Sequence, residues 1–258
     1  MPRARALPDA DLERRFGGLR RLYGDAAYGR LRAASAAVIG LGGVGAWAAE
    51  ALARSGLARL VLIDLDHIAE SNINRQVQAL GRTLGQHKGL ALQERIADIH
   101  PGCEVQVVDA FVDAGNWPAL LPAPVDAVID ACDQVRAKAA VAAWALREAQ
   151  PLVCVGAAGG RRRAQDVEVA DLAEASHDPL LASLRQRLRR DAVAPRQGRI
   201  GLRCVFSREA VAAPGGPGAV DRGLNCHGYG SSVMVTASFG MVAAGEALAL
   251  ALGPAARD

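Results

Sequence analysis

A short segment near the start of the chain constrains the fold more than any other. Residues 36–56 read "AAVIGLGGVGAWAAEALARSG", a short apolar run, a glycine-rich turn and a run with helical spacing of apolar side chains. Gly40, Gly42 and Gly45 satisfy the pattern G-x-G-x-x-G, which allows a tight turn, close approach of backbone to phosphate and close helix packing. Because a helix N-terminus favours an anion, the segment predicts a phosphate-binding turn. It leaves open whether the ligand is a dinucleotide or another nucleotide.

Short apolar runs rich in β-branched residues recur through the first 160 residues, with helical patterns between most of them. The expected strands are 36–40, 59–64, 104–109, 125–131 and 151–156, and the expected helices are 45–55, 86–99 and 135–149. Strands that alternate with helices in this way form a mostly parallel sheet covered on both faces. The sequence therefore predicts an α/β protein with a Rossmann-like core over residues 1–160.

The pattern loosens after residue 160, where we expect a C-terminal α+β extension, residues 161–258, packed with the core as one domain. The segments "DVEVADL" and "LRCVFS" are typical of strands, and "DPLLASLRQRLRRD" is typical of a basic amphipathic helix. Residues 207–225 are rich in Gly, Pro and Ala and predict a mobile loop. The last apolar segment is long enough to span a bilayer, but Glu246 and the lack of a basic flank favour a buried helix over membrane contact.

Composition narrows the class of protein. The 258 residues are 51% hydrophobic and can bury a full core, which predicts a globular protein. The first residues, "MPRARALPDADLERRFGG", have neither the apolar stretch of a secretory signal nor the acid-poor character of a transit peptide, so we expect a cytoplasmic location. The five cysteines include no C-x-x-C pair, which argues against a structural zinc site or a disulfide framework. We expect Cys103, Cys132, Cys154 and Cys204 to lie in the core.

Lysine is almost absent from this chain. Of the 30 basic residues only Lys88 and Lys138 are lysines, and the other 28 are arginines. A compact ammonium on a flexible stem is not replaced by a planar guanidinium, so either lysine could mark a point where an ammonium is needed. The alternative is that these two lysines remain by chance. The hypothesis that an ammonium is required is favoured less for Lys138 than for Lys88.

Polar residues after the glycine turn decide between two kinds of nucleotide chemistry. Asp64 follows the second strand and is placed to accept hydrogen bonds from ribose hydroxyls. A nicotinamide dehydrogenase leaves its pyrophosphate intact, whereas cleavage between phosphates builds charge that cations and Mg²⁺ stabilise. Arg75 and Lys88 supply such cations, and Asp133, after a central strand, could hold Mg²⁺. Ordinary surface charges are the alternative for each residue alone.

The motifs in this order resemble those of the E1-like adenylating enzymes, which activate the thiamine and molybdopterin sulfur carriers. The resemblance covers residues 15–160 through "GLGGVG", "LIDLDHIAESNINRQ", "GQHK" and "DACDQ", where Gln134 stands in place of the family's common Asn. It implies an ATP-binding fold and a homodimer. The residues that it would assign to the ATP site are Gly40, Gly42, Gly43 and Gly45 beneath the phosphates, Asp64 on the ribose, Asn72, Arg75, Gln76 and Lys88 toward the phosphates, Asp133 with Mg²⁺, and Arg15 reaching into the neighbouring subunit.

Within this family, "RFGGLRRLYG", "VGAAGG", "GLRCVFSREA" and "NCHGYGSSVMVTASFG" look like the tRNA-modifying branch, the threonylcarbamoyladenosine dehydratases. This resemblance implies ATP-dependent cyclisation of N6-threonylcarbamoyladenosine at position 37 of tRNAs that read codons beginning with A. The threonyl carboxylate would be activated as an acyl adenylate, with Arg75, Lys88 and Asp133 as catalytic residues. Two arginine clusters suit an RNA backbone, Arg161 to Arg163 and the set Arg185, Arg187, Arg189 and Arg190, although a solvated surface is the alternative.

Cys226, in "LNCHGYG", is similar in position to a cysteine of the family and is a candidate nucleophile or sulfur carrier. An intramolecular cyclisation does not require a covalent enzyme intermediate, so an inert cysteine remains an alternative. Two other functions stay open. One is activation of a ubiquitin-like sulfur carrier or of a partner in a cysteine desulfurase system, and the other is a nicotinamide-dependent dehydrogenase.

Overall fold

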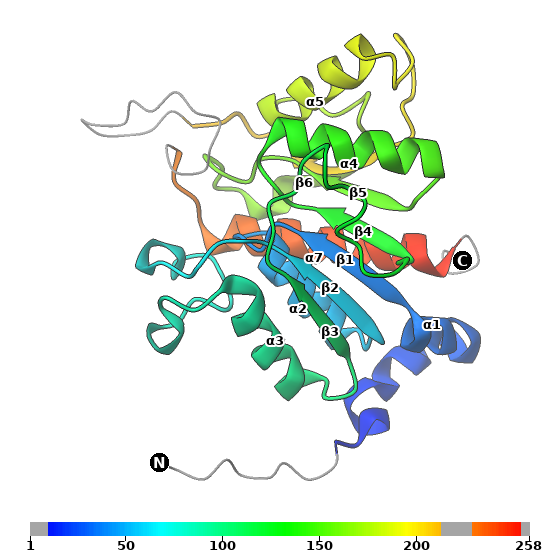
Figure 1. The fold of residues 1–258 in the computed structure, drawn as a ribbon, viewed down its shortest axis with the longest axis vertical. Coiled ribbons are helices and arrows are strands. Elements are labelled where there is room, and N and C mark those ends of the chain that lie inside the picture. Colours follow the sequence, from blue (N-terminus) through cyan, green and yellow to red (C-terminus); the bar gives the residue numbers. More distant parts are fainter. Residues whose placement is uncertain (1–9, 213–228, 254–258) are drawn as a thin grey trace.

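The computed structural model describes residues 10–212 and 229–253, which form a seven-stranded sheet with helices on both sides (Figure 1). The strand order is β3-β2-β1-β4-β5-β7-β6, and neighbouring strands are parallel except that β6 runs antiparallel to β7. The strands are β1 (Ser35–Ile39), β2 (Arg59–Ile63), β3 (Glu104–Val108), β4 (Ala127–Asp130), β5 (Leu152–Val155), β6 (Val167–Asp171) and β7 (Arg203–Ser207). The predicted mostly parallel α/β sheet is confirmed.

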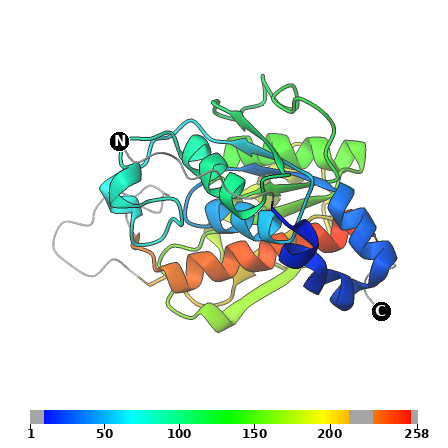
Figure 2. The ribbon, with the colours of Figure 1, turned by 90° about the horizontal axis from the view of Figure 1, so that it is seen from below.

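The helices divide between the two faces of the sheet. They are α1 (Leu12–Ala33), α2 (Gly45–Arg54), α3 (Lys88–Ile99), α4 (Val135–Glu148), α5 (Pro179–Arg190) and α7 (Val233–Leu252), with short 3₁₀ turns η1 (Glu70–Asn72), η2 (Gly81–Thr83) and η3 (Ala164–Asp166). One apolar core joins the sheet to α1, α2, α3 and α7, and the other joins it to α4 and α5. Figure 2 shows α7, coloured orange to red, beside the blue helix α2, which it contacts. Strand β1 is buried on both faces, because Val38 belongs to the first core and Ile39 to the second.

The C-terminal extension is continuous with the core. Strand β7 pairs with β5, and β6 pairs with β7, so both predicted strands of the extension complete the same sheet. The predicted loop 207–225 is wrong at its start. Ser207 ends β7 and is fully buried, and the Glu209 carboxylate accepts hydrogen bonds from the backbone N–H groups of Arg162 and Arg163. The remainder of that loop, from residue 213, lies outside the described residues.

The last helix packs against the protein along one side only. This side of α7 contacts α2, β4 and β5, and a Cβ on Gly240 would meet the Val44 carbonyl oxygen at 2.6 Å, so only glycine permits this close crossing. Met234 and Met241 are exposed on its other side. By length and hydropathy the helix could cross a membrane, and 44% of its most apolar window is buried, so the expected buried helix is buried on one side and exposed on the other.

The sheet topology determines where a ligand can bind. Strand order reverses between β1 and β4, because the chain leaves β1 toward β2 and β3 and later returns on the other side of β1. In open α/β sheets such a switch point leaves a crevice at the carboxyl ends of the strands. The glycine turn follows β1, Asp64 follows β2 and Asp133 follows β4, so the fold brings all three predicted elements to this crevice.

Candidate nucleotide-binding site

A cleft of about 480 Å³ opens at this edge of the sheet. Its lining includes the predicted residues Gly40, Gly42, Gly43, Asp64, Asn72, Arg75, Gln76, Lys88 and Asp133. It also includes residues that the sequence analysis did not single out, among them Phe111, Cys132, Ala157, Ser231 and Thr236. Phe111 follows β3 by three residues, and this position beyond the carboxyl end of a strand could have predicted its place in the cleft. Ser231 and Thr236 lie at or near the start of α7, far away in the sequence, so no sequence signal placed them there.

Glycine is needed at each position of the turn for a different structural reason. Gly40 has a φ of 82°, and a Cβ there would lie 3.0 Å from the backbone nitrogen of Cys132. A Cβ on Gly45, the first residue of α2, would overlap the carbonyl oxygen of Gly40. A Cβ on Gly42 would meet no other described atom within 4 Å, since that position faces the open cleft. Gly40 and Gly45 therefore shape the turn, and Gly42 leaves space for a ligand.

Substitution of these glycines should separate folding from binding. We expect Gly45→Ala to lower the melting temperature strongly, because its methyl group has no room against Gly40. Gly42→Ala should keep the wild-type melting temperature and weaken ATP binding by roughly tenfold, about 1.4 kcal/mol, by placing a methyl group in the cleft. Thermal unfolding and titration calorimetry measure both effects. Equal ATP affinity of Gly42→Ala and wild type would contradict this assignment.

Gly43 has a packing role in addition to its predicted role beneath the phosphates. A Cβ there would lie 3.1 Å from Cγ2 of Thr236 and 3.2 Å from Cγ of Arg75. A larger residue would therefore push the start of α7 and the Arg75 side chain away from the turn.

Asp64 supports the glycine turn with both carboxylate oxygens. Oδ2 accepts a hydrogen bond of 2.6 Å from the Leu41 N–H, and Oδ1 accepts one of 2.8 Å from the Asp66 N–H. The Leu41 carbonyl in turn accepts a 3.0 Å bond from the buried Gln78 amide. Because each carboxylate oxygen has a second lone pair, Asp64 can hold the turn and still accept from a ribose hydroxyl.

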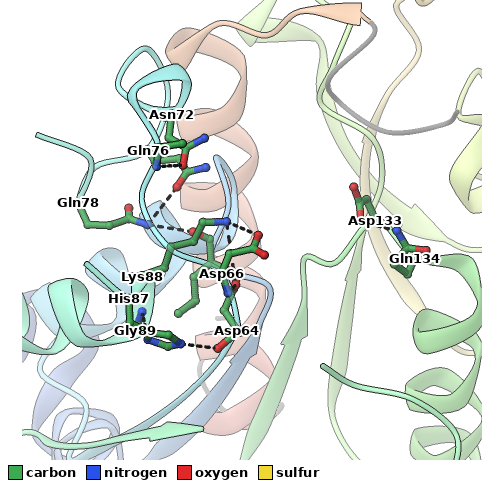
Figure 3. A network of polar contacts seen from close by, with 12 residues as sticks. Asp64, Asp66, Asn72, Gln76, Gln78, His87, Lys88, Gly89, Asp133 and Gln134 are labelled. Atoms are coloured by element: carbon green, nitrogen blue, oxygen red, sulfur yellow. Dashed lines mark hydrogen bonds and ion pairs between the residues drawn. The ribbon is translucent and has the colours of Figure 1, made fainter. Parts of the chain in front are cut away.

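Lys88 is the first residue of α3 and lies in the wall of the cleft. Its Nζ is 2.7 Å from Oδ2 of Asp66 and 4.0 Å from Oδ1 of Asp64 (Figure 3). The Lys88 residue is only 7% exposed, whereas 62% of the Asp66 side chain is exposed. An ammonium held in a cleft wall by a solvated carboxylate can exchange that partner for a bound phosphate.

The segment around η1 adds polar groups to the same wall. Asn72 is buried, and its side-chain oxygen accepts a hydrogen bond from the Ala69 N–H, which leaves its amide donors for other partners. Nη1 of Arg75 donates to the Ser71 carbonyl at 2.6 Å and to the Asn74 side chain at 2.9 Å. Gln76 is also buried and accepts a bond from Gln78. The structure thus brings Asn72, Arg75 and Gln76 into the same cleft lining as Lys88. Figure 3 shows Asn72 and Gln76 on the Lys88 side of the cleft.

Asp133 lies across the cleft from the Lys88 wall (Figure 3). It is half-buried, lies one residue before Gln134, the N-cap of α4, and accepts a long hydrogen bond of 3.4 Å from the Gln134 side chain. Within residues 10–212 and 229–253 no three His, Cys, Asp or Glu side chains form a cluster that could hold a metal ion. A cation at Asp133 would therefore need oxygen atoms from the nucleotide itself, as is common for Mg²⁺.

The four cysteines of the described part differ in burial, and only Cys132 lines the cleft. Cys154 and Cys204 are fully buried, as expected, but Cys103 and Cys132 are only partly buried. Cys132 lines the cleft, and burial together with the Asp130 carboxylate raises the pKa of its thiol well above the usual value. Cys226, the predicted candidate, lies outside the described residues.

Arg15 does not contribute to the cleft of its own chain. Its Nη1 donates to the carbonyl oxygens of Asp98 and Ile99 at 2.7 and 2.6 Å, at the end of α3. Lys88 begins the same 12-residue helix, which is about 18 Å long. Arg15 is therefore far from the cleft within one chain, and only a second subunit could place it in a site.

Part of the predicted RNA-binding arginine set is structural, which corrects the sequence analysis. Arg161 is 2% exposed and pairs with the buried Asp178. Nη1 of Arg185 donates to the carbonyls of Leu172 and Ala175. A chain can use the five donors of arginine to tie its own carbonyls together, and a sequence run cannot distinguish this from a phosphate-binding surface. Arg162 and Arg163 are exposed and remain candidates for RNA.

Comparison with known proteins now assigns the family, because residues 15–257 match the ThiF family. The chain belongs to the ThiF family. It is 43% identical over 256 residues to the tRNA threonylcarbamoyladenosine dehydratase of Escherichia coli K12, covering 95% of this chain and 96% of that protein. It is 40% identical to the protein of the same name from Haemophilus influenzae, covering 90% of each. The resemblance to E1-like adenylating enzymes is confirmed.

A solved structure shows the same fold over nearly the whole chain. The crystal structure of the Escherichia coli tRNA N6-threonylcarbamoyladenosine dehydratase in complex with ATP aligns with a TM-score of 0.85 at 42% identity, covering 94% of this chain and 96% of that one. A structure of the same enzyme with AMP aligns with a TM-score of 0.84. Because the likeness covers the extension as well as the core, this ThiF-family chain has the fold of the dehydratase throughout its described part.

Proposed function

We propose that this protein catalyses the ATP-dependent cyclisation of N6-threonylcarbamoyladenosine in tRNA. The observation that carries this proposal is the cleft itself, in which Lys88 and Asp133 face each other above an open glycine turn. An ATP complex of a 42% identical dehydratase with the same fold supports it. A dehydrogenase has no comparable use for cations opposite a carboxylate, because its pyrophosphate remains intact.

The proposed reaction is an adenylation followed by ring closure. An oxygen of the threonyl carboxylate attacks the α-phosphorus of ATP, the bond to the β-phosphate oxygen breaks, and pyrophosphate leaves. A nearby atom of the same side chain then attacks the carbonyl carbon of the acyl adenylate, which closes the ring and releases AMP. Lys88 and Arg75 stabilise the negative charge that develops on the pyrophosphate, from one wall of the cleft.

Asp133 fits the role of a Mg²⁺ ligand. Asp133 is half-buried, and its carboxylate accepts a long hydrogen bond of 3.4 Å from the Gln134 side chain. The other lone pairs of the carboxylate oxygens can therefore bind a cation. Mg²⁺ in nucleotide sites is often held by one or two carboxylates together with phosphate oxygens. When bound, the ion would neutralise charge on the phosphates.

The tRNA and the cell compartment belong to the same proposal. Exposed Arg162 and Arg163 lie at the start of the extension and can contact phosphates of the RNA backbone. A tRNA substrate implies the cytoplasm, as expected from the sequence. The role of Cys226 and a partner from a cysteine desulfurase system also stay proposals, and a persulfide found on Cys226 by mass spectrometry after incubation with such a partner would support them. An unmodified Cys226 under those conditions would count against both.

A homodimer would give Arg15 a function that one chain cannot. We expect Arg15→Ala and Asp133→Ala variants each to be inactive and their mixture to recover activity, since a mixed dimer contains one intact site if Arg15 acts across the interface. No recovery, with subunit exchange verified, would contradict this arrangement.

The decisive experiment measures pyrophosphate release from ATP with purified tRNA. Release should require tRNA that carries the threonylcarbamoyl group, and nucleoside mass spectrometry of the product should show the modified nucleoside 18 Da lighter, as expected for loss of one water. Pyrophosphate release with tRNA that lacks the group would sink the proposal. A second arm with a small carrier protein ending in Gly-Gly tests the alternative of sulfur-carrier activation.

A further inference from the structure

Directly beneath the cleft lies a buried ion pair that the proposed function does not use. Lys138, on α4, and Asp130, the last residue of β4, are both 0% exposed. Nζ of Lys138 lies 3.0 Å from Oδ2 of Asp130 as an ion pair without hydrogen-bond geometry, and it donates a hydrogen bond of 3.0 Å to the backbone carbonyl of the same residue. One of the two lysines of the chain is therefore bound to both oxygen-bearing groups of a single aspartate.

This pair fixes the turn that carries Asp133. Oδ1 of Asp130 accepts a hydrogen bond of 3.1 Å from the Cys132 N–H, so the carboxylate holds the first step of the turn. The Ala131 N–H donates to the Ile39 carbonyl, and the Cys132 nitrogen packs against the turn at Gly40. Residues 130–132 are thus fixed by the Asp130 carboxylate and by the neighbouring strand β1. These contacts limit the positions that the next residue, Asp133, can take.

Stability alone is a poor explanation for the pair. Burying two charges costs desolvation energy that their attraction roughly offsets, and replacement by apolar residues is often neutral. Burial disfavours the charge on Lys138, but the Asp130 carboxylate raises the pKa of the ammonium above its usual value, so Lys138 stays charged. What an ion pair adds over an apolar pair is a fixed geometry at the end of β4.

An ammonium suits this position better than the guanidinium that the chain uses elsewhere. The carbonyl oxygen and the carboxylate of Asp130 are both contacted by one nitrogen at 3.0 Å, which requires a compact head group. A planar guanidinium needs more space and places its donors further apart. The retention of lysine among 28 arginines is consistent with this requirement.

We propose that Lys138 is a positioning residue, which acts through Asp130 to hold the turn 131–133 so that the Asp133 carboxylate faces the nucleotide phosphates. The inference rests on the proposed role of Asp133 as a Mg²⁺ ligand. Residues that orient a ligand from behind typically change metal affinity or activity by about 10-fold to 100-fold when replaced.

The test compares ATP affinity with and without Mg²⁺ by titration calorimetry, and it needs no tRNA. In the double variant Asp130→Asn, Lys138→Met both charges are removed together, so we expect the melting temperature to stay near that of wild type. The gain in ATP affinity on adding Mg²⁺ should fall by about tenfold, while the affinity for ATP in EDTA should change by less than about twofold. On an Asp133→Asn background the double variant should cause no further loss.

A control removes a partly buried ion pair elsewhere, in which the Glu50 side chain is 4% exposed and the Arg95 side chain 32% exposed. Glu50→Gln combined with Arg95→Met removes this pair between α2 and α3, and it also takes from exposed Arg54 its carboxylate partner. Neither change touches the turn 131–133, so this variant should keep the Mg²⁺ gain of wild type. Three results would overturn the proposal. The double variant at Asp130 and Lys138 keeps the full increase in ATP affinity on adding Mg²⁺, or its ATP affinity in EDTA falls as much as its affinity with Mg²⁺, or it does not fold. A wild-type protein with no gain overturns the assignment of Asp133 and this inference with it, whereas failure of the tRNA reaction alone leaves the calorimetric result standing.

Discussion

Replacing Lys88 with alanine is expected to lower the rate of pyrophosphate formation by about 10²-fold to 10³-fold, the usual effect of removing one donor from a site of developing charge. The reason is the position of its Nζ in the wall of the cleft, where 7% exposure of the residue keeps water away from the charge. The measurement is steady-state pyrophosphate release with threonylcarbamoylated tRNA. The melting temperature should change little, because the partner Asp66 is solvated and does not become a buried unpaired charge.

Two further variants make this prediction specific. Arg82→Ala removes one positive charge from the exposed turn η2, outside the lining of the cleft, and should keep wild-type activity. Lys88→Arg should remain well below wild type, because Lys88 is only 7% exposed and the larger planar guanidinium must displace its neighbours and present its donors in other positions. If Arg82→Ala loses as much activity as Lys88→Ala, general charge and not a local contact explains the effect.

The periodic part of the fold could be predicted from the sequence. Each of the predicted core strands and helices occurs with bounds close to those expected, because short β-branched runs and helical spacing directly reflect burial on two faces of a parallel sheet. Helix α1 was not predicted. Its sequence contains Gly17, Gly18 and Gly24, and Gly24, with a φ of 79°, interrupts the helix. Because glycine has a low helix propensity, the sequence did not indicate a helix here, and tertiary contacts stabilise it.

The sequence correctly predicted those site residues whose positions depend only on the sheet topology. Asp64 and Asp133 follow strands on either side of the switch point, and parallel strands bring their carboxyl ends to one edge. The contribution of α7 was not predictable, because the approach of Thr236 to Gly43 depends on how a distant helix crosses α2. Side-chain partners were equally hidden, since only packing decides whether an arginine meets solvent or its own chain.

The largest expected stability effect follows from that last point and concerns Arg161. Its guanidinium donates to the carbonyls of Ala157, Ser207 and Glu209 at 2.8, 2.6 and 2.5 Å and pairs with the buried Asp178 at 3.3 Å. Arg161→Ala would remove the donor from these carbonyls and leave the buried Asp178 carboxylate without a countercharge, although it keeps its hydrogen bonds from the Ala157 and Leu181 N–H groups. The loss of one partner of a buried ion pair typically costs about 3–5 kcal/mol. In a protein of this size each kcal/mol lowers the melting temperature by about 2–4 °C, so we expect a fall of roughly 10 °C.

The neighbouring arginines provide the control within the same sequence run. Arg162 and Arg163 are exposed, so the double variant Arg162→Ala, Arg163→Ala should keep the wild-type melting temperature. It should weaken tRNA binding and reduce the dependence of log affinity on log salt by up to about two units, because each phosphate contact contributes roughly one unit. Calorimetric unfolding and filter binding at several salt concentrations measure the two effects. If instead the double variant unfolds as early as Arg161→Ala while binding tRNA normally, the division between structural and RNA-binding arginines is wrong.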